Sequence, residues 1–207
     1  MPELPEVEVV RRGIEPYTRD WAVERVRVYD PRSLKRHDGP EEDFIERLTG
    51  RTLQGAVRRG KFLWVPLGDG EALVCHLGMS GQVLLGHAPD QFGPLLRVAL
   101  ELLGPGEQRM VWGFVDQRLF GSLAIDTLVD SGSDAPAGYG HPSADIPRQV
   151  AHIARDALDE ALDEKALVRK IRQKTSGIKR VLLDQSVLSG VGNIYADEAL
   201  WRARLHY

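Results

Sequence analysis

The spacing of apolar residues changes along the chain, and this change constrains the fold more than any other feature of the sequence. Up to about residue 125, short apolar or alternating runs such as 61–65 and 96–100 are separated by glycine-rich turns, which is typical of β-strands. The composition then shifts to Ser, Gly, Asp, Ala and Pro, and from residue 150 the apolar spacing is helical. The sequence therefore predicts an α+β protein with two domains: an antiparallel β-sandwich with an N-terminal helix over 1–125, a linker over 126–149, and an all-α domain over 150–207.

Helical spacing also predicts individual helices. Leu4, Val7, Val10 and Ile14 form an apolar stripe at the start of the chain, and residues 43–48 form a short helix between two strands. In the C-terminal part we expect helices over a segment that contains Ile153, Ala157 and Ala161, and over 166–173, 178–188 and 194–203. We expect five acidic residues to form a solvated helix face there: Asp156, Asp159, Glu160, Asp163 and Glu164.

Composition excludes several classes of protein. With 207 residues, 43% hydrophobic and 28% charged, the chain can bury a core, and it has no apolar run that is long enough to span a membrane. We expect no signal peptide, because Glu3 and Glu6 interrupt the start, and hence a cytoplasmic protein. The single cysteine, Cys75, excludes an internal disulfide and a multi-cysteine metal site within this chain. Its apolar neighbours indicate a small buried hydrophobe.

The overall charge argues against a nucleic-acid partner, but its distribution favours one. The formal net charge is −3 and the isoelectric point is about 6.1, whereas DNA-binding domains are commonly basic. Residues 165–207, however, carry nine Lys or Arg against three Asp or Glu, a difference of +6. This tail is a candidate phosphate-facing surface.

The first residues suggest covalent chemistry. If Met1 is removed, which the small ring of Pro2 permits, the chain begins with a secondary amine whose pKa lies near about 7.7–8.0, so that part of it is a neutral nucleophile. Attack on an anomeric carbon would give an iminium ion that promotes elimination. Glu3 is placed to shuttle protons, and Glu6, one turn later, to hold the loop or its hydrogen bonds. The alternative is structural, because Pro and Glu are ordinary residues of a first helical turn.

Two glycines and an asparagine lie between two helical segments near the end of the chain. Gly190 and Gly192 can take positive φ in a compact double turn, and Asn193 can cap the next helix while backbone amides point at a phosphate. A helical hairpin with a glycine cap would explain this segment as well.

Together, five motifs resemble the bacterial formamidopyrimidine-DNA glycosylases, the family that includes endonuclease VIII. The resemblance covers essentially the whole chain, and Leu4 favours the formamidopyrimidine branch, because endonuclease VIII relatives typically have Gly there. The motifs are the start Met-Pro-Glu-Leu-Pro-Glu-Val-Glu, Arg59-Gly60-Lys61-Phe62-Leu63, His76-Leu77-Gly78-Met79-Ser80-Gly81, Asp116-Gln117-Arg118-Leu119-Phe120-Gly121, and the double turn within 182–200.

The resemblance implies roles for particular residues. In the catalytic site it implies Pro2 as the Schiff-base nucleophile, Glu3 as the acid-base carboxylate, Glu6 as a further active-site acid and Lys61 as a lysine that holds the phosphate beside the damaged sugar. For the gap left by an everted base it implies Met79, Arg118 and Phe120. For the phosphates or the surroundings of the lesion it implies His76, Lys179 and Asn193. Without the resemblance, Lys61 and Arg118 would be read as surface residues, Met79 and Phe120 as core residues, and His76 as structural.

The implied function is base-excision repair by a DNA glycosylase that removes oxidised purines and also cleaves abasic sites by β,δ-elimination. The implied partner is damaged double-stranded DNA, bound by a monomer that is nucleoid-associated when it acts and includes a helix-two-turns-helix domain. The sequence departs from the family at Tyr207, where relatives continue with further helices and a zinc finger that holds one structural zinc. We therefore expect no cofactor in this chain, which is a fragment or a short form with weak lyase and strongly reduced glycosylase activity.

Three other interpretations stay open at this point. Within the enzyme class, the chain could act on oxidised pyrimidines as endonuclease VIII does. Outside it, the double-turn segment would suffice for a non-catalytic nucleic-acid-binding protein, although Pro2, Glu3 and Lys61 would then be unexplained. The acidic charge balance also fits a structural or interaction protein that merely keeps the fold.

Overall fold

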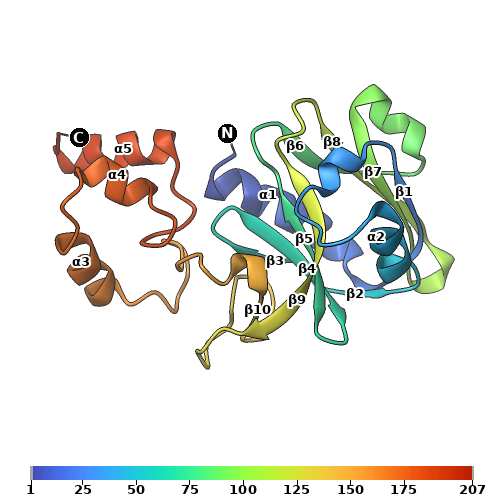
Figure 1. Ribbon diagram of the computed structural model, residues 1–207, viewed down its shortest axis with the longest axis horizontal. Helices are drawn as coiled ribbons and strands as arrows, with labels where there is room; N and C mark the ends of the chain where they lie inside the picture. Colours follow the sequence, from blue (N-terminus) through green and yellow to red (C-terminus); the bar gives the residue numbers. More distant parts are fainter. Residues whose placement is uncertain (1, 207) are drawn as a thin grey trace.

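The computed structural model describes residues 2–206 and has an α+β architecture, with a β-sandwich at one end and helices at the other (Figure 1). The strands are β1 Arg19–Val28, β2 Thr52–Gln54, β3 Val57–Arg59, β4 Phe62–Gly68, β5 Glu71–His76, β6 Gly81–Gly86, β7 Leu96–Leu103, β8 Arg109–Asp116, β9 Ser122–Asp130 and β10 Asp145–Pro147. The α-helices are α1 Leu4–Ile14, α2 Glu41–Leu48, α3 Glu164–Arg172, α4 Ile178–Leu183 and α5 Asn193–Ala203.

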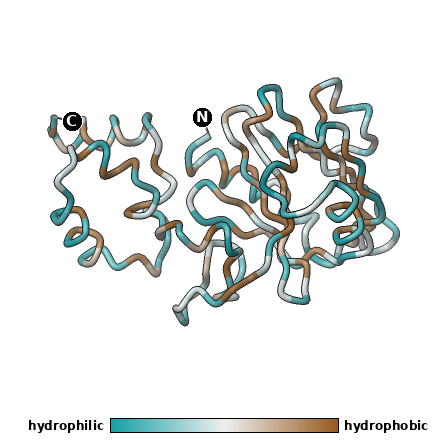
Figure 2. The backbone as a smooth tube through the Cα atoms, in the orientation of Figure 1, coloured by the Kyte–Doolittle hydropathy of each residue, from teal (hydrophilic) through white to brown (hydrophobic). Residues whose placement is uncertain are grey.

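Two antiparallel five-stranded sheets build the sandwich. The strand orders are β2-β1-β7-β8-β6 and β10-β9-β5-β4-β3. Side chains from both sheets meet in one apolar core, in which Phe114 of β8 and Leu73 of β5 are fully buried. Figure 2 shows that apolar segments coincide with the paired strands, whereas α3 is largely hydrophilic. The predicted β-sandwich with an N-terminal helix is therefore confirmed. The two sheets pack together because strands with one apolar face must bury that face against a second layer.

Part of the segment predicted as a linker belongs to the sandwich instead. It carries the end of β9 and all of β10, which pair antiparallel with each other. Ala137 and Ile146 of this segment are buried against Trp64 on the outer face of the second sheet. This cover explains why β4 reads as a continuous apolar run: its two faces are buried in two different cores. Composition alone did not show that a Gly- and Pro-rich segment packs on a sheet.

Helix α1 lies on the side of the sandwich that faces the C-terminal helices (Figure 1). Leu4, Val7 and Ile14 of the predicted apolar stripe are buried, and Val10 is half-buried. The helix begins after Glu3, whose amide donates to the Glu6 carboxylate at 2.9 Å. This bond is one half of a capping box and satisfies an amide that the helix leaves free.

In the C-terminal part, one predicted helix is absent and another is shorter than predicted. Residues around Ile153 and Ala157 form turns rather than a helix, because the Asp156 and Asp159 side chains accept from the amides two residues ahead, those of Leu158 and Ala161. Helix α4 ends at Leu183, where Asp184 accepts from the amide and the hydroxyl of Ser186. Short polar side chains therefore compete with the helix in both places. Helix α5 begins one residue before its predicted start.

A buried ionic network joins the sandwich to the C-terminal part. The Arg58 guanidinium of β3 bonds the Glu8 carboxylate of α1 at 2.9 Å and the Asp156 carboxylate at 2.7 Å. Asp156 also accepts from the amide of Gly60 at 3.0 Å. Burial raises the pKa of Glu8, but hydrogen bonds from Arg11 and Arg58 outweigh it and lower that pKa overall. The expectation that Asp156 lies on a solvated helix face is wrong, because its side chain is 3% exposed.

We expect Asp156→Asn to lower the free energy of unfolding by about 3–5 kcal/mol, because it leaves the buried Arg58 guanidinium short of a partner. Urea denaturation at neutral pH measures this difference. Asp69→Asn is the matched control, because Asp69 also pairs with an arginine but its side chain is 84% exposed. Its effect should stay below about 1 kcal/mol. Equal losses in the two variants would contradict the structural role assigned to Asp156.

Candidate active site between the sandwich and the C-terminal helices

The Glu3 carboxylate lies at the N-terminus of α5, almost the whole chain away in sequence. Its oxygens accept from the amides of Gly192 at 2.7 Å, Ile194 at 2.9 Å and Tyr195 at 3.2 Å. Glu3 is only 3% exposed, so these three hydrogen bonds replace the water that a carboxylate requires. The positive end of the helix dipole stabilises the same charge. The backbone of the next residue is fixed as well, because the Leu4 amide donates to the Gly190 carbonyl at 3.0 Å.

Pro2 precedes this anchored pair directly and is half-buried. Because consecutive Cα atoms are about 3.8 Å apart, Pro2 lies close to the anchored Glu3. The expected removal of Met1 lies outside the described residues. Glu6 is exposed and accepts from the Glu3 amide, so it holds the chain around Glu3, as the sequence suggested.

The glycines of the double turn are needed for two different reasons. Gly190 has a φ of +86°, as predicted. Gly192 has a φ of −122°, so the expectation of positive φ is wrong there. A Cβ atom there would lie 2.5 Å from Cδ of Glu3, so any larger residue would displace that side chain. The Gln185 side chain closes the turn by accepting from the Gly190 amide and donating to the Val191 carbonyl, both at 2.9 Å.

Asn193 does not cap α5. The N-cap position belongs to Gly192, and Asn193 is the first helical residue, with an exposed side chain. The amides that were expected to point at a phosphate bond the Glu3 carboxylate instead. Lys179 of α4 forms an ion pair with Asp197 of α5 at 2.6 Å, which ties the two helices of the motif together.

Lys61 lies in the two-residue turn between β3 and β4, and this turn packs against the double turn. A Cβ atom on Gly60 would lie 2.7 Å from the Ser189 side chain. Burial lowers the pKa of the Lys61 ammonium, and the nearby negative charge of Glu3 opposes that shift. Among residues 2–206 the half-buried ammonium has neither a hydrogen-bond acceptor nor an ion-pair partner. It therefore stays available to an anion from outside.

His76 at the end of β5 is a neutral donor in a positive field. Burial, together with the charges of Arg36, Lys61 and Lys35, lowers the pKa of His76 to about 4. Its Nδ1 accepts from the Gly78 amide at 3.1 Å, so the proton of the neutral ring is on Nε2. The ring packs on Phe62, with centroids 4.7 Å apart. Nε2 is thus a hydrogen-bond donor among three cations.

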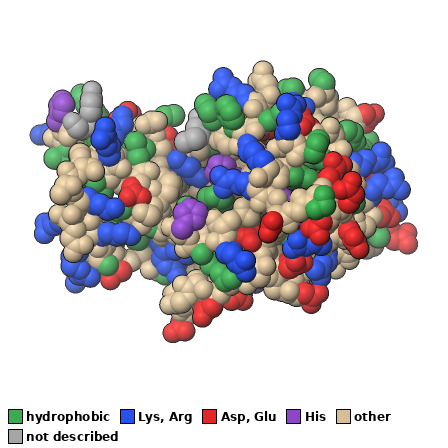
Figure 3. All heavy atoms as spheres, viewed as in Figure 1, with side chains coloured by type: hydrophobic (Ala, Val, Ile, Leu, Met, Phe, Trp, Pro, Cys, Tyr) green, Lys and Arg blue, Asp and Glu red, His purple; other side chains and the backbone are tan. Residues whose placement is uncertain are grey.

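Lys35 and Arg36 also belong to this basic cluster, although they are not among the residues predicted from the sequence. They are exposed and come from the loop after β1, and the Arg36 guanidinium lies 5.5 Å from the Phe62 ring centroid. The run Lys35-Arg36-His37 was the available signal, but only the fold brings it near His76. Figure 3 shows basic side chains spread over the helical part, whereas acidic ones gather chiefly over the sandwich.

Met79 and Phe120 are exposed, at 45% and 52%, so neither is a core residue. They lie on neighbouring loops that follow β5 and β8, and Arg118 of the second loop is exposed as well. The two loops touch, because a Cβ atom on Gly78 would lie 2.4 Å from the backbone of Phe120. The structure therefore brings the three side chains predicted to fill a gap in DNA onto one edge of the sandwich.

The described residues do not provide a metal site. Within residues 2–206, His, Cys, Asp and Glu side chains form no group of three that could hold an ion. Cys75 is buried in the core, as predicted, and burial raises the pKa of its thiol. Residues 2–206 therefore include no donor set for the zinc that the family resemblance implies for longer relatives. No helix among the described residues is long and apolar enough to cross a membrane.

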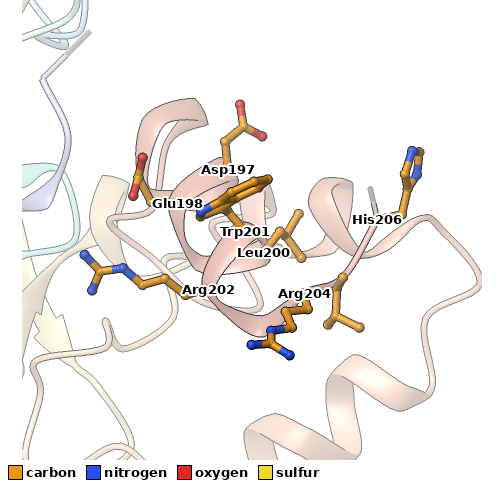
Figure 4. Close-up of a pocket in the computed structure, with 8 residues that line it drawn as sticks. Asp197, Glu198, Leu200, Trp201, Arg202, Arg204 and His206 are labelled. Carbon is orange, nitrogen blue, oxygen red and sulfur yellow. The ribbon is translucent and has the colours of Figure 1, made fainter.

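A cavity of about 1020 Å³ lies near the C-terminal end of α5, away from Glu3 (Figure 4). Its lining includes the exposed Trp201, flanked in the figure by Asp197 and by Arg202. It does not include any of the predicted catalytic residues. We therefore place the candidate active site around Glu3 and Lys61 rather than in this cavity.

Comparisons with known proteins agree with this architecture. The profile described as the formamidopyrimidine-DNA glycosylase N-terminal domain matches residues 1–123, and that described as the H2TH domain of the same enzyme matches residues 153–207. The formamidopyrimidine-DNA glycosylase of Leifsonia xyli subsp. xyli is 52% identical over 209 residues, which cover all of this chain and 70% of the relative. That of a Nocardioides species is 51% identical, with 100% and 65% covered.

Solved structures give the same answer. A complex of the Lactococcus lactis FPG protein with DNA that contains FAPY-dG matches with a TM-score of 0.77 and 29% identity, covering 99% of this chain and 69% of that one. Its complex with DNA that contains an abasic site matches with a TM-score of 0.77 as well. Fold and site thus define a DNA glycosylase of the base-excision repair class. The chain belongs to the formamidopyrimidine-DNA glycosylase family, and it spans about two thirds of the length of these relatives.

We expect Gly192→Ala to reduce any reaction at Pro2 by about tenfold or more, because the new methyl group would displace the Glu3 carboxylate. The measurement is the rate at which the protein becomes linked to abasic-site DNA under borohydride. Gly177→Ala is the control, because a Cβ atom there meets nothing within 4 Å. Equal rates for both variants and the unchanged protein would contradict the importance of this contact.

The depressed pKa of His76 predicts a loss of stability in acid. Below the ordinary pKa of 6.5 the unfolded chain takes up a proton that folded His76 accepts only near pH 4, so stability falls between these values. We expect the unchanged protein to lose roughly 1–3 kcal/mol more than His76→Gln between pH 7 and pH 4. Urea denaturation at both pH values measures this. Parallel losses would show that folded His76 titrates normally.

Proposed function

We propose that this chain forms a covalent iminium linkage with the deoxyribose of damaged DNA through Pro2, and that it acts in the bacterial cytoplasm as an oxidised-purine glycosylase and abasic-site lyase. The observation that carries the proposal is the anchorage of Glu3 by three amides of α5, directly beside Pro2. Such a contact keeps a terminal amine close to the junction of the sandwich and the C-terminal helices. A strand that bound across the junction would meet this amine.

The proposed chemistry begins after Met1 has been removed. The neutral Pro2 nitrogen attacks C1′, the bond from C1′ to the damaged base breaks, and the base leaves with a proton supplied from the site. The sugar ring then opens as Glu3 delivers a proton to the ring oxygen, and an iminium ion forms between Pro2 and C1′. A base removes a proton from C2′, the electron pair moves toward the positive nitrogen, and the 3′ phosphate leaves. Removal of the C4′ proton in the same way then expels the 5′ phosphate.

Phosphate binding is assigned to Lys61 and His76. The Lys61 ammonium is half-buried, and a phosphate oxygen would supply the counter-charge that its surroundings lack. His76 would donate its Nε2 proton to a neighbouring phosphate without needing a positive charge of its own. Lys179 and Asn193 on α4 and α5 are assigned to the same strand.

The exposed loop tips support base eversion. A base that leaves the helix leaves a gap, and an apolar wedge with a planar donor can fill it. Met79 and Phe120 supply the apolar groups, and Arg118 supplies the donor. Cleavage of abasic DNA needs no eversion of a base, so we propose that lyase activity exceeds glycosylase activity in this chain.

The test uses borohydride to reduce the iminium ion that forms on duplex DNA with one abasic site. We expect a covalent adduct whose protein part lacks Met1, and we expect Pro2→Gly to reduce its yield by about tenfold or more. Pro5→Gly is the matched control, because it changes a proline of the same first turn that lies within the helix. Absence of an adduct from protein shown by mass to lack Met1 would sink the proposal.

A further inference from the structure

Asp116, the last residue of β8, is a buried carboxylate that the proposed chemistry does not use. Its side chain is 0% exposed. Oδ1 accepts from the Ser80 hydroxyl at 2.5 Å and from the Arg118 amide at 3.1 Å, and Oδ2 accepts from the Gly121 amide at 2.8 Å. One carboxylate therefore binds the loop that carries Met79 and both ends of the loop that carries Phe120.

The Ser80 hydroxyl closes this arrangement. It donates to Asp116 and accepts from the Arg118 amide at 3.1 Å, so the three groups form a closed set of hydrogen bonds. Asp116 itself is held in place, because its carbonyl accepts from the Arg97 side chain at 2.7 Å and it pairs with Gly81 across the sheet. The set is thus anchored in rigid strands rather than in the loops that it holds.

The second loop needs such support. Leu119 has a φ of +56°, a conformation that is unfavourable for a bulky residue and persists only where the surroundings enforce it. The Lys35 ammonium donates to the Leu119 carbonyl at 2.6 Å, which adds a third point of attachment. The strain falls between Arg118 and Phe120, the two residues whose side chains project into solvent.

We propose that Asp116 is a positioning residue that fixes the Met79 loop and the Arg118–Phe120 loop to each other, so that the three side chains enter the DNA gap as one preformed unit. The inference rests on the proposed function, because it presumes that these side chains fill the gap. The two oxygens of a carboxylate can accept from all three donors, whereas an amide would turn its NH₂ group toward at least one of them. Because both loops are already ordered in the free protein, DNA binding does not bear the entropic cost of ordering them.

The experiment measures two things separately: the insertion of the three side chains into the DNA gap, and the covalent reaction with the sugar. Insertion is measured by the fluorescence of 2-aminopurine placed opposite a tetrahydrofuran abasic analogue, and chemistry by borohydride trapping on natural abasic-site DNA. We expect Asp116→Asn to lower the affinity for this DNA, read from the change in fluorescence, by about tenfold. The rate of borohydride trapping should fall much less. Met79→Ala provides the reference for a lost wedge, and Asp90→Asn, an exposed carboxylate on the same domain, should change neither readout.

Ser80→Ala keeps the test decisive if Asp116→Asn fails to fold. It should weaken insertion in the same direction, and the double variant should lose no more than the larger of the two single losses, because both remove one closed set of bonds. Insertion at the unchanged level in folded variants would overturn the inference, and so would equal losses in insertion and trapping. If the unchanged protein shows insertion but yields no adduct, the proposed function fails while the positioning role stands.

Discussion

The contact between the Glu3 carboxylate and the first amides of α5 is the interaction on which the rest of the site depends. It buries a negative charge at the junction of two domains, where only the N-terminus of a helix supplies enough donors to replace water. In doing so it keeps Pro2 close to the N-terminus of α5, and a Cβ atom at position 192 would displace the Glu3 carboxylate. A terminus that would otherwise fray becomes part of a defined site.

Two other buried carboxylates play comparable parts. Asp156 connects the Arg58 guanidinium with the turn that carries Lys61, and Asp116 connects the two exposed loops at the edge of the sandwich. Each binds backbone amides of a functional turn and is itself anchored to a strand or to a charged partner. Buried charges of this kind add little net stability, but they restrict the chain to one arrangement. The proposed active site is built from such restrictions rather than from a deep cavity.

The predicted helices are wrong where short polar side chains compete with the backbone for hydrogen bonds. The apolar spacing around Ile153 predicts a helix, but the side chains of Asp156 and Asp159 accept from amides two residues ahead, and the chain forms turns instead. The same competition ended α4 before the predicted residue. The Gly- and Pro-rich segment before these turns looked like a linker, because no local pattern reveals that Ile146 fills a space beside Trp64.

The sequence by itself determined the β-sandwich, the helix at residues 4–14, the buried Cys75 and the family, because apolar periodicity and ordered motifs are local properties of the chain. Only the tertiary structure decided which charged side chains are buried and which groups form hydrogen bonds with them. It placed Glu3 on α5 rather than leaving those amides to a phosphate, and it buried Asp156. Each of these outcomes depends on donors supplied by residues far away in sequence, and no local pattern records them.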